Sequence, residues 1–278
     1  MAPTVEILST ERHADMTKTC HVRLLHTTTV KGAPVKSAPV KSIRYARVLP
    51  GALPTNWIEP GTNIKLPEFP EGDWEIVDLV PGKVKGEAKV VDPRKGRILE
   101  LTAWHNHSVD YFELRKMFQH PFARLCGKRN DSMFLVRHES LMRTAGVMVA
   151  FMKIANALPE LRNISAELRV YQELEGSGIA PRFIGHVTEN GRVVGFLTEY
   201  LEDAYPPRLS NFEACATVLG KLHAKGIIHG DAHSGNFLIK PDGTAVLIDF
   251  ELSRPCKCPR TLRQEMEELQ YELPSESL

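Results

Sequence analysis

The chain has 278 residues, of which 42% are hydrophobic and 25% charged, as in soluble globular proteins that bury a core. Its 35 Lys and Arg nearly cancel its 34 Asp and Glu, so no nucleic-acid partner held by gross positive charge is expected. The longest apolar stretch, Val147 to Leu158, is too short to span a bilayer and contains Lys153, so no membrane partner is expected either.

Targeting and redox signals favour the cytoplasm or nucleus. Residues 1–20 contain no apolar run of the secretory type, and the five cysteines are too few and too scattered for a disulfide framework. The pairs Cys256–Cys258 and His105–His107 are spaced more closely than the ligand pairs of structural zinc sites, so we expect no zinc.

The first third of the chain is rich in proline. Residues 1–42 are expected to form a flexible tail, because a tandem Ala-Pro-Val-Lys-Ser repeat favours a solvated, extended chain. Residues 43–110 predict a proline-rich extended region that packs on a neighbouring lobe, with Trp57 and Trp74 as anchors, followed by a β-hairpin over residues 86–101.

Residues 111–202 predict the N-lobe of a two-lobed fold. The clearest strands are residues 133–136 and 147–154, and a helix follows with Asn163 as its N-cap. A strand pair then turns at Asn190-Gly191.

Residues 203–278 predict a minimal C-lobe. A helix is expected to begin at a capping box at Ser210, a hairpin covers residues 237–248, and a last helix covers residues 261–273. Only 27 residues (252–278) follow Glu251, which leaves room for about one helix. The predicted fold class is therefore α+β, a two-lobed protein-kinase-like fold with a truncated C-lobe.

The strongest motif is His229-Gly-Asp-Ala-His-Ser-Gly-Asn236, followed by Leu247-Ile-Asp-Phe-Glu251. Four residues separate Asp231 from Asn236, and twelve separate Asn236 from Asp249, which is the spacing of a kinase catalytic loop and its metal-binding triplet. Phosphoryl transfer needs a carboxylate that orients the acceptor hydroxyl, and oxygen ligands that hold Mg²⁺. Asp231 suits the first role, and Asn236 and Asp249 suit the second. The alternative is that these residues only cap turns.

Lys153 lies inside an apolar strand, where an unpaired charge is costly. Glu167 lies fourteen positions later, beside the apolar face of the next helix. A Lys–Glu pair of this kind fixes the ammonium on the α- and β-phosphates of ATP. The alternative is an interfacial lysine whose ammonium reaches solvent.

These motifs, together with Glu167–Leu174 and Gly178–His186, carry a resemblance to fungal kinase-like proteins related to aminoglycoside phosphotransferases. The resemblance runs from about Tyr111 to Leu273. The His-Gly-Asp-x-His-x-x-Asn form is similar to that of the aminoglycoside and choline kinase branches, and the short C-terminus resembles minimal atypical kinases. The resemblance implies that residues 196–201 are the hinge that binds adenine, chiefly through Glu199 and Leu201.

The sequence departs from ordinary protein kinases in three places. It has no G-x-G-x-x-G motif, and residues 127–130 are the nearest candidate for a phosphate-covering turn. Gly230 replaces the arginine that would pair with a phosphorylated activation loop, and no Ala-Pro-Glu segment follows Glu251.

The expected activity is an ATP- and Mg²⁺-dependent transfer of the γ-phosphate to a hydroxyl of a small molecule or of a protein Ser or Thr. The alternative is a pseudokinase, a nucleotide-binding scaffold without transferase activity.

Overall fold

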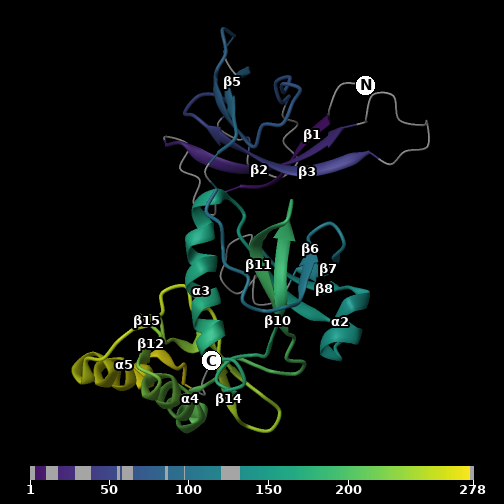
Figure 1. Cartoon of the computed structure of the whole chain (residues 1–278). Helices are drawn as coiled ribbons and strands as arrows, with labels where there is room; N and C mark the ends of the chain where they lie inside the picture. Colours follow the sequence, from purple (N-terminus) through teal and green to yellow (C-terminus); the bar gives the residue numbers. More distant parts are fainter. Residues whose placement is uncertain are drawn as a thin grey trace.

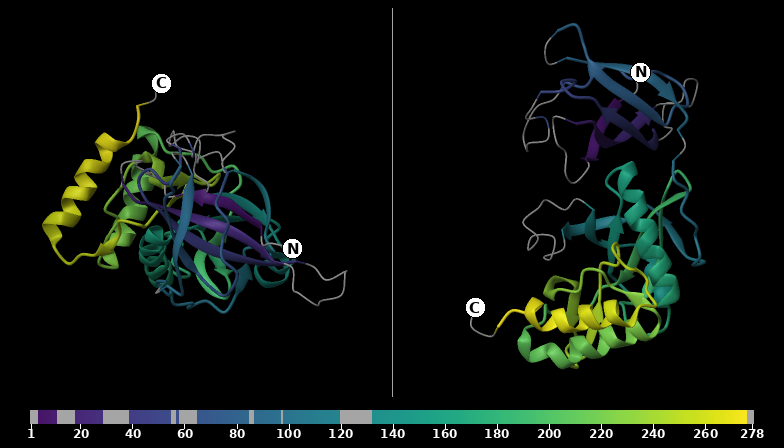
Figure 2. Two further views of the ribbon diagram at one scale, coloured as in Figure 1. Left: turned by 90° about the horizontal axis from the view of Figure 1, so that it is seen from above. Right: turned by 90° about the vertical axis from the view of Figure 1, so that its left-hand side faces the viewer.

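Two large β-sheets and a helical end build this α+β fold, taken here from a computed structural model. The strands β1–β5 form one sheet at one end of the molecule, the second sheet and helix α3 lie in the middle, and α4 and α5 lie at the other end (Figure 1). The side view in Figure 2 has the same stacking. The structure describes residues 4–10, 18–28, 39–54, 57, 65–84, 87–96, 98–119 and 132–275.

The N-terminal sheet has five strands in the order β1-β2-β3-β4-β5. Neighbouring strands are antiparallel except for the parallel pair β3–β4. Val22 and Leu24 on β2 are fully buried, and Cys20 at the start of the strand is buried as well. The strands are β1 (Thr4–Thr10), β2 (Cys20–Thr28), β3 (Val40–Val48), β4 (Ile76–Pro81) and β5 (Ala88–Arg94).

This sheet overturns two expectations. The predicted flexible tail over residues 1–42 is wrong, because β1, β2 and the start of β3 lie there and bury apolar side chains. The predicted hairpin over residues 86–101 is also wrong, because β5 pairs with β4 and residues 98–101 form no strand. Trp57 and Trp74 are buried among residues of the N-terminal sheet itself, in a core of its own.

The central sheet has six strands in the order β6-β10-β11-β9-β8-β7, and only β6 and β10 run parallel. The predicted strand pair turning at Asn190 is confirmed as β10 and β11, and the two predicted strands before the helix are confirmed as β8 and β9. The strands are β6 (Ser108–Asp110), β7 (Arg115–Gln119), β8 (Met133–Arg137), β9 (Ala150–Ile154), β10 (Phe183–Glu189) and β11 (Arg192–Glu199).

The helices cover one face of the central sheet and build the far end of the molecule. They are α2 (Glu139–Ala145), α3 (Leu161–Glu173), α4 (Phe212–Ala224) and α5 (Pro259–Glu272), with short 3₁₀ turns at Leu158–Glu160, Leu209–Asn211 and Ser234–Asn236. Two small antiparallel pairs complete this end: β12 (Ile227–Ile228) with β15 (Arg254–Pro255), and β13 (Phe237–Ile239) with β14 (Ala245–Leu247).

Both predicted helix starts need correction. Helix α3 begins at Leu161, so Asn163 lies inside it and is not its N-cap. Helix α4 begins at Phe212 with Asn211 as its N-cap, because a 3₁₀ turn occupies Ser210. In each case a short 3₁₀ turn precedes the helix, which a search for capping residues does not anticipate. The predicted last helix and the hairpin before it are confirmed.

In the part of the chain that the structure describes, no helix combines the length and apolar character needed to cross a membrane. The candidate phosphate-covering turn at residues 127–130 lies outside the described residues.

Candidate active site

Lys153 lies on β9, in the middle of the central sheet. It pairs with Phe196 of β11 on one side and Met133 of β8 on the other, and only 3% of its side chain is exposed. The β9–β11 approach is close enough that a Cβ atom at Gly195 would lie 2.3 Å from the Lys153 carbonyl oxygen, so only glycine fits there. The lysine therefore projects from a rigid, closely packed sheet.

Helix α3 brings Glu167 to this lysine. Leu161, Ile164, Leu168 and Tyr171 form the apolar stripe that buries α3 against the sheet, and Glu167 lies on the same stripe with 1% of its side chain exposed. Its Oε1 lies 2.5 Å from the Lys153 Nζ. The predicted pairing of the two residues is thus present in the structure.

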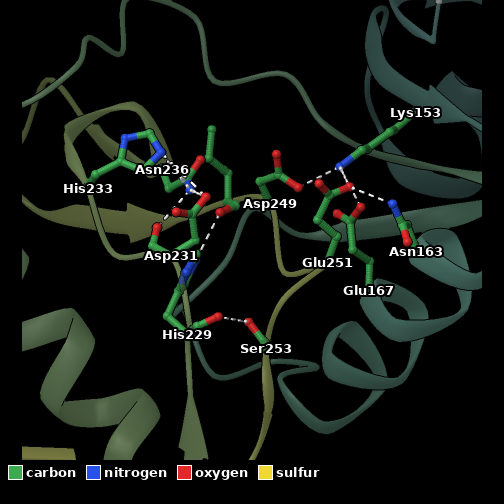
Figure 3. A network of polar contacts seen from close by, with 11 residues as sticks. Lys153, Asn163, Glu167, His229, Asp231, His233, Asn236, Asp249, Glu251 and Ser253 are labelled. Atoms are coloured by element: carbon green, nitrogen blue, oxygen red, sulfur yellow. Dashed lines mark hydrogen bonds and ion pairs between the residues drawn. The ribbon is translucent and has the colours of Figure 1, made fainter. Parts of the chain in front are cut away.

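Lys153 also contacts the segment that follows the hairpin. Its Nζ lies 2.7 Å from Asp249 Oδ1 and 3.9 Å from a carboxylate oxygen of Glu251, whose Oε2 accepts a hydrogen bond from Asn163 (Figure 3). The carboxylate oxygens of Glu167, Asp249 and Glu251 lie within 4.8 Å of one another. Oxygen-only clusters of this kind are typical ligand sets for hard divalent cations such as Mg²⁺.

In this cluster the described residues contribute three carboxylates and one ammonium. Burial opposes the charged form of Lys153, but the three carboxylates outweigh it and raise the pKa of the ammonium. Burial, with Asp249 and Glu251 nearby, raises the pKa of Glu167 to about 7 in spite of Lys153. Lys153 is the cation that the described residues place against these three carboxylates, and such a cluster suits an additional positive charge.

The catalytic-loop motif occupies the turn between β12 and β13. Gly230 has a φ of +82°, and a Cβ there would lie 2.6 Å from the Leu252 carbonyl oxygen, which explains why glycine stands between His229 and Asp231. The His229 ring is buried, donates from Nε2 to the Ile248 carbonyl at 3.1 Å, and thereby ties the loop to the segment carrying Asp249.

Asp231 and Asn236 are in direct contact. The Asn236 Nδ2 donates to the Asp231 carbonyl oxygen at 2.8 Å and to its Oδ2 at 2.9 Å, and half of the Asp231 side chain is exposed. Since the amide nitrogen is engaged, the amide oxygen of Asn236 is the atom suited to a metal ion.

Asn236 is also tied to the strand that precedes Asp249. Its carbonyl accepts from the Ile248 N–H at 3.0 Å, so the hairpin brings the Asn236 and Asp249 side chains to one region (Figure 3). Asp249 has a φ of +62°, a left-handed conformation that is uncommon for aspartate.

A cavity of about 110 Å³ joins most of these residues. Its walls include Lys153, Glu167, Asn236 and Asp249, together with the predicted hinge residues Glu199 and Leu201. Apolar side chains complete the lining, as in pockets that hold a planar heterocycle: Met133, Phe151, Tyr171, Pro181, Phe196, Leu238 and Ile248. Asp231 instead faces a second cavity of about 380 Å³, between the catalytic loop and α5.

Glu265 is a residue of this site that the sequence reasoning missed. From α5 it accepts the backbone N–H groups of His229 (3.1 Å) and Gly230 (2.6 Å) and contacts the His223 Nε2 at 2.7 Å. Burial opposes its ionisation, but these hydrogen bonds lower the pKa of Glu265. A signal was present, because Glu265 interrupts the apolar stripe of α5 between Leu262 and Leu269.

The histidines at positions 186 and 233 accept hydrogen bonds from backbone N–H groups. His186 Nε2 accepts the backbone N–H groups of Trp104 and His105, at 3.1 and 3.2 Å. His233 Nδ1 accepts the Gly235 N–H at 3.0 Å.

Comparisons with known proteins agree with this geometry. Residues 195–255, from β11 to β15, match the family model described as "Phosphotransferase enzyme family". The chain is similar to a "Probable bifunctional tRNA threonylcarbamoyladenosine biosynthesis protein" of Methanospirillum hungatei, with 34% identity over 89 residues, 32% of this chain and 16% of the relative. A protein of the same description from Methanothermobacter thermautotrophicus is 31% identical over 91 residues, 32% of this chain and 17% of the relative.

The chain thus spans about a sixth of the length of these curated relatives. The match to the phosphotransferase model covers the hinge, the catalytic loop and the Asp249 segment, and it supports a kinase-like fold and a phosphotransferase type of site.

Proposed function

We propose that this protein is an ATP- and Mg²⁺-dependent phosphotransferase that transfers the γ-phosphate to a hydroxyl group. The observation that carries this proposal is the convergence of one buried ammonium and three carboxylates, of which Glu167 and Asp249 line, with Lys153, a narrow and largely apolar cavity. Phosphoryl transfer is catalysed mainly by positioning and by neutralising charge, and this arrangement provides both.

Each residue of the site then has one role. Lys153, held by Glu167, would bind the α- and β-phosphates, and the oxygens of Asn236 and Asp249 would hold Mg²⁺. Bound Mg²⁺ would neutralise negative charge on the transferred phosphoryl group. Asp231 would orient the acceptor hydroxyl, since its carboxylate is half exposed and fixed by Asn236.

The hinge has backbone groups suited to adenine. The Glu199 N–H donates to the Arg182 carbonyl at 2.9 Å, so the Glu199 carbonyl is the group that would accept from the exocyclic amine. The Leu201 N–H would donate to a ring nitrogen, two residues further along the same wall.

The cavity beside Asp231 supports a small-molecule acceptor over a polypeptide. It has a volume of about 380 Å³, within the usual range for small-molecule pockets, and α5 forms one wall of it with Gln264, Glu268 and Glu272. A protein Ser or Thr remains the second acceptor class, and it requires that a loop of the substrate enter this cavity.

The alternative function is a nucleotide-binding scaffold without transfer. Two observations favour it: the sequence has no G-x-G-x-x-G loop, and the Asp249 carboxylate is engaged by Lys153. Both functions require Mg-ATP binding, so only turnover separates them.

The test is Mg²⁺-dependent ATP turnover of the wild type, Asp231→Asn, Asp249→Asn and the control Asp242→Asn in an exposed hairpin turn. Transferase function predicts a loss of about 10²–10³ in rate for the first two variants and none for the control. Asp231→Asn should retain Mg-ATP binding, and Asp249→Asn should lose it. Equal background turnover in all four proteins, with a thermal shift by Mg-ATP in the wild type, would support the scaffold instead.

A further inference from the structure

The N-terminal sheet contacts the central sheet through a buried polar joint. Arg23 of β2 forms an ion pair with Glu189 at the end of β10, and both side chains are at most 2% exposed. The Tyr45 hydroxyl donates to the other oxygen of the same carboxylate at 3.2 Å, and the Arg23 guanidinium lies 4.2 Å from the centroid of the Tyr111 ring. Removing one partner of such a pair leaves an uncompensated buried charge, so breaking this joint is costly.

The turn between β10 and β11 is also held against the N-terminal sheet. Asn190 adopts a left-handed conformation with a φ of +49°. Its side chain forms two hydrogen bonds with the backbone of Ile43 on β3. The Asn190 Nδ2 donates to the Ile43 carbonyl at 2.8 Å, and its Oδ1 accepts the Ile43 N–H at 3.3 Å.

A second contact lies at the connector between β9 and α3, residues 155–160. The Ser9 hydroxyl of β1 donates to the Asn156 carbonyl at 2.8 Å, and the Asn156 N–H donates to Glu160 Oε2 at 2.9 Å. Leu158 of the connector packs against the small apolar cluster of Ile43, Tyr45 and Ile76 in the sheet. The connector is thus fixed by polar and apolar contacts with the same sheet.

This connector joins the two charged partners of the nucleotide site. Lys153 lies at the end of β9, just before it, and Glu167 lies on α3, just after it. The β10–β11 turn leads into the strand that pairs with Lys153 through Phe196. Whatever fixes the connector and the turn therefore also fixes the distance between the Lys153 ammonium and the Glu167 carboxylate.

We propose that the sheet β1–β5 is an intramolecular positioning module for the nucleotide site. Its contacts through Ser9 and Arg23 hold the connector and the β10–β11 turn, so that Lys153 and Glu167 keep their ion-paired geometry. Ser9 and Arg23 are positioning residues and do not touch the nucleotide. This inference rests on the proposed Mg-ATP site.

The experiment compares the full-length wild type with Ser9→Ala, Arg23→Met and the control Arg47→Met. Arg47 forms its ion pair with Asp78 inside the sheet, so the control removes an arginine from the same sheet without changing the joint. Two quantities are measured: the Kd for Mg-ATP, and the hydrogen exchange of the α3 amides relative to those of α4.

Ser9→Ala should weaken Mg-ATP binding roughly three- to ten-fold, since it removes one buried hydrogen bond, and Arg23→Met should weaken it more. Exchange in α3 should accelerate by a similar factor, with α4 unchanged. Ser9→Thr keeps the hydroxyl and should restore the wild-type Kd, and Arg47→Met should not change it. In steady-state kinetics, the weaker binding should raise the KM for ATP. The kcat at saturating ATP should stay within about two-fold of the wild-type value.

Wild-type values for both Ser9→Ala and Arg23→Met, in Kd and in α3 exchange, would overturn the proposal. If Arg23→Met does not fold, Ser9→Ala and its threonine rescue decide. A wild type that fails to bind Mg-ATP would refute the proposed function, whereas the exchange of α3 in Ser9→Ala would still decide whether the sheet positions this helix.

Discussion

At the scale of single residues, the central feature is the excess of negative charge around Lys153. One buried ammonium is shared by Glu167, Asp249 and Glu251, whose oxygens lie within 4.8 Å of one another. Burial first, and the neighbouring Asp249 and Glu251 carboxylates second, raise the pKa of the Glu167 carboxyl to about 7. A proton or a divalent cation can compensate such a cluster. The same charges that hold the lysine are those that would favour the Mg²⁺ of the proposed function.

Lys153→Met should be strongly destabilising, because it removes a buried ammonium that pairs with three neighbouring carboxylates. We expect the free energy of unfolding at pH 8 to fall by about 3–5 kcal/mol, the usual cost of breaking a buried ion pair. Mg-ATP binding should also be lost. Urea unfolding and nucleotide titration measure the two effects.

Lys240→Met is the matched control, since Lys240 is one-third exposed and pairs with Asp242 across a surface turn. It should change the stability by no more than about 0.5 kcal/mol. Equal losses in the two variants would contradict the role assigned to the buried lysine.

At the scale of elements, α5 holds the segment that carries the catalytic-loop motif, residues 229–236, through hydrogen bonds that its Glu265 accepts. Glu265 binds two consecutive backbone N–H groups of the loop, at His229 and Gly230, and the Ser253 hydroxyl donates to the His229 carbonyl at 2.8 Å. The loop has little regular structure of its own, so its conformation depends on these contacts with neighbouring elements.

Glu265→Gln should lower kcat by about 10- to 100-fold while leaving the Kd for Mg-ATP near its wild-type value. Glutamine can accept only one of the two backbone hydrogen bonds with its single carbonyl oxygen, and a lost buried hydrogen bond costs about 1–3 kcal/mol. Steady-state kinetics and nucleotide titration separate the two parameters.

Glu267→Gln changes an exposed carboxylate on the same helix and should behave as the wild type. A Glu265→Gln enzyme with unaltered kcat would mean that α5 does not position the loop.

The elements also differ in how far the sequence could predict them. The catalytic loop and the Asp249 segment are local motifs whose spacing reflects one hairpin, so residues 229–251 were predicted closely. The β3–β4 pairing of the N-terminal sheet was missed because it is non-local: the two strands run parallel and are joined by a 27-residue crossover, 49–75, without a helix or strand among its described residues. Proline content suggested an extended chain there, but nothing in a local pattern says which strands meet.

The contacts of Glu265 and Arg23 were missed for the same reason. Each is a charged residue within an otherwise apolar pattern, which indicates that a partner exists but not which one. Their partners lie 35 and 166 positions away in the sequence.

At the scale of the whole molecule, two hydrophobic cores meet at a polar joint. The larger core lies between the central sheet and the helices, and the smaller one lies beneath the N-terminal sheet around Trp57 and Trp74. Each core contains a buried histidine. Burial, with Arg44 nearby, lowers the pKa of His26 to about 4, and burial, with His105 nearby, lowers that of His186 to about 4.

These histidines predict acid sensitivity of the fold. The unfolded chain binds protons at histidine with a pKa of about 6.5, whereas the folded chain binds them only near pH 4, so the unfolded state holds more protons between these values. The contribution of these two histidines to stability should be full above pH 6.5 and fall as the pH is lowered to 4, by about 1.4 kcal/mol for each unit of pKa difference.

His26→Phe should reduce this acid-side loss without lowering the stability at pH 8. Among the described residues, neither ring nitrogen of His26 has a hydrogen-bond partner, and the ring packs edge-on against Trp74, a contact that phenylalanine can keep. Urea unfolding at pH 8 and pH 5 measures the difference. An unchanged difference between the two pH values would rule out His26 as a source of the acid loss.

The tryptophans are divided between the two cores. Trp57 and Trp74 belong to the N-terminal sheet, and Trp104, the third and last in the chain, packs on Phe183 of the central sheet with ring centroids 4.4 Å apart. Intrinsic fluorescence can therefore follow the two halves one at a time. Trp104→Phe confines the tryptophan emission to the N-terminal sheet, and replacing both Trp57 and Trp74 by phenylalanine confines it to the half that contains the central sheet. Superimposable denaturation curves from the two proteins would identify a single cooperative unit, and separate midpoints would resolve two.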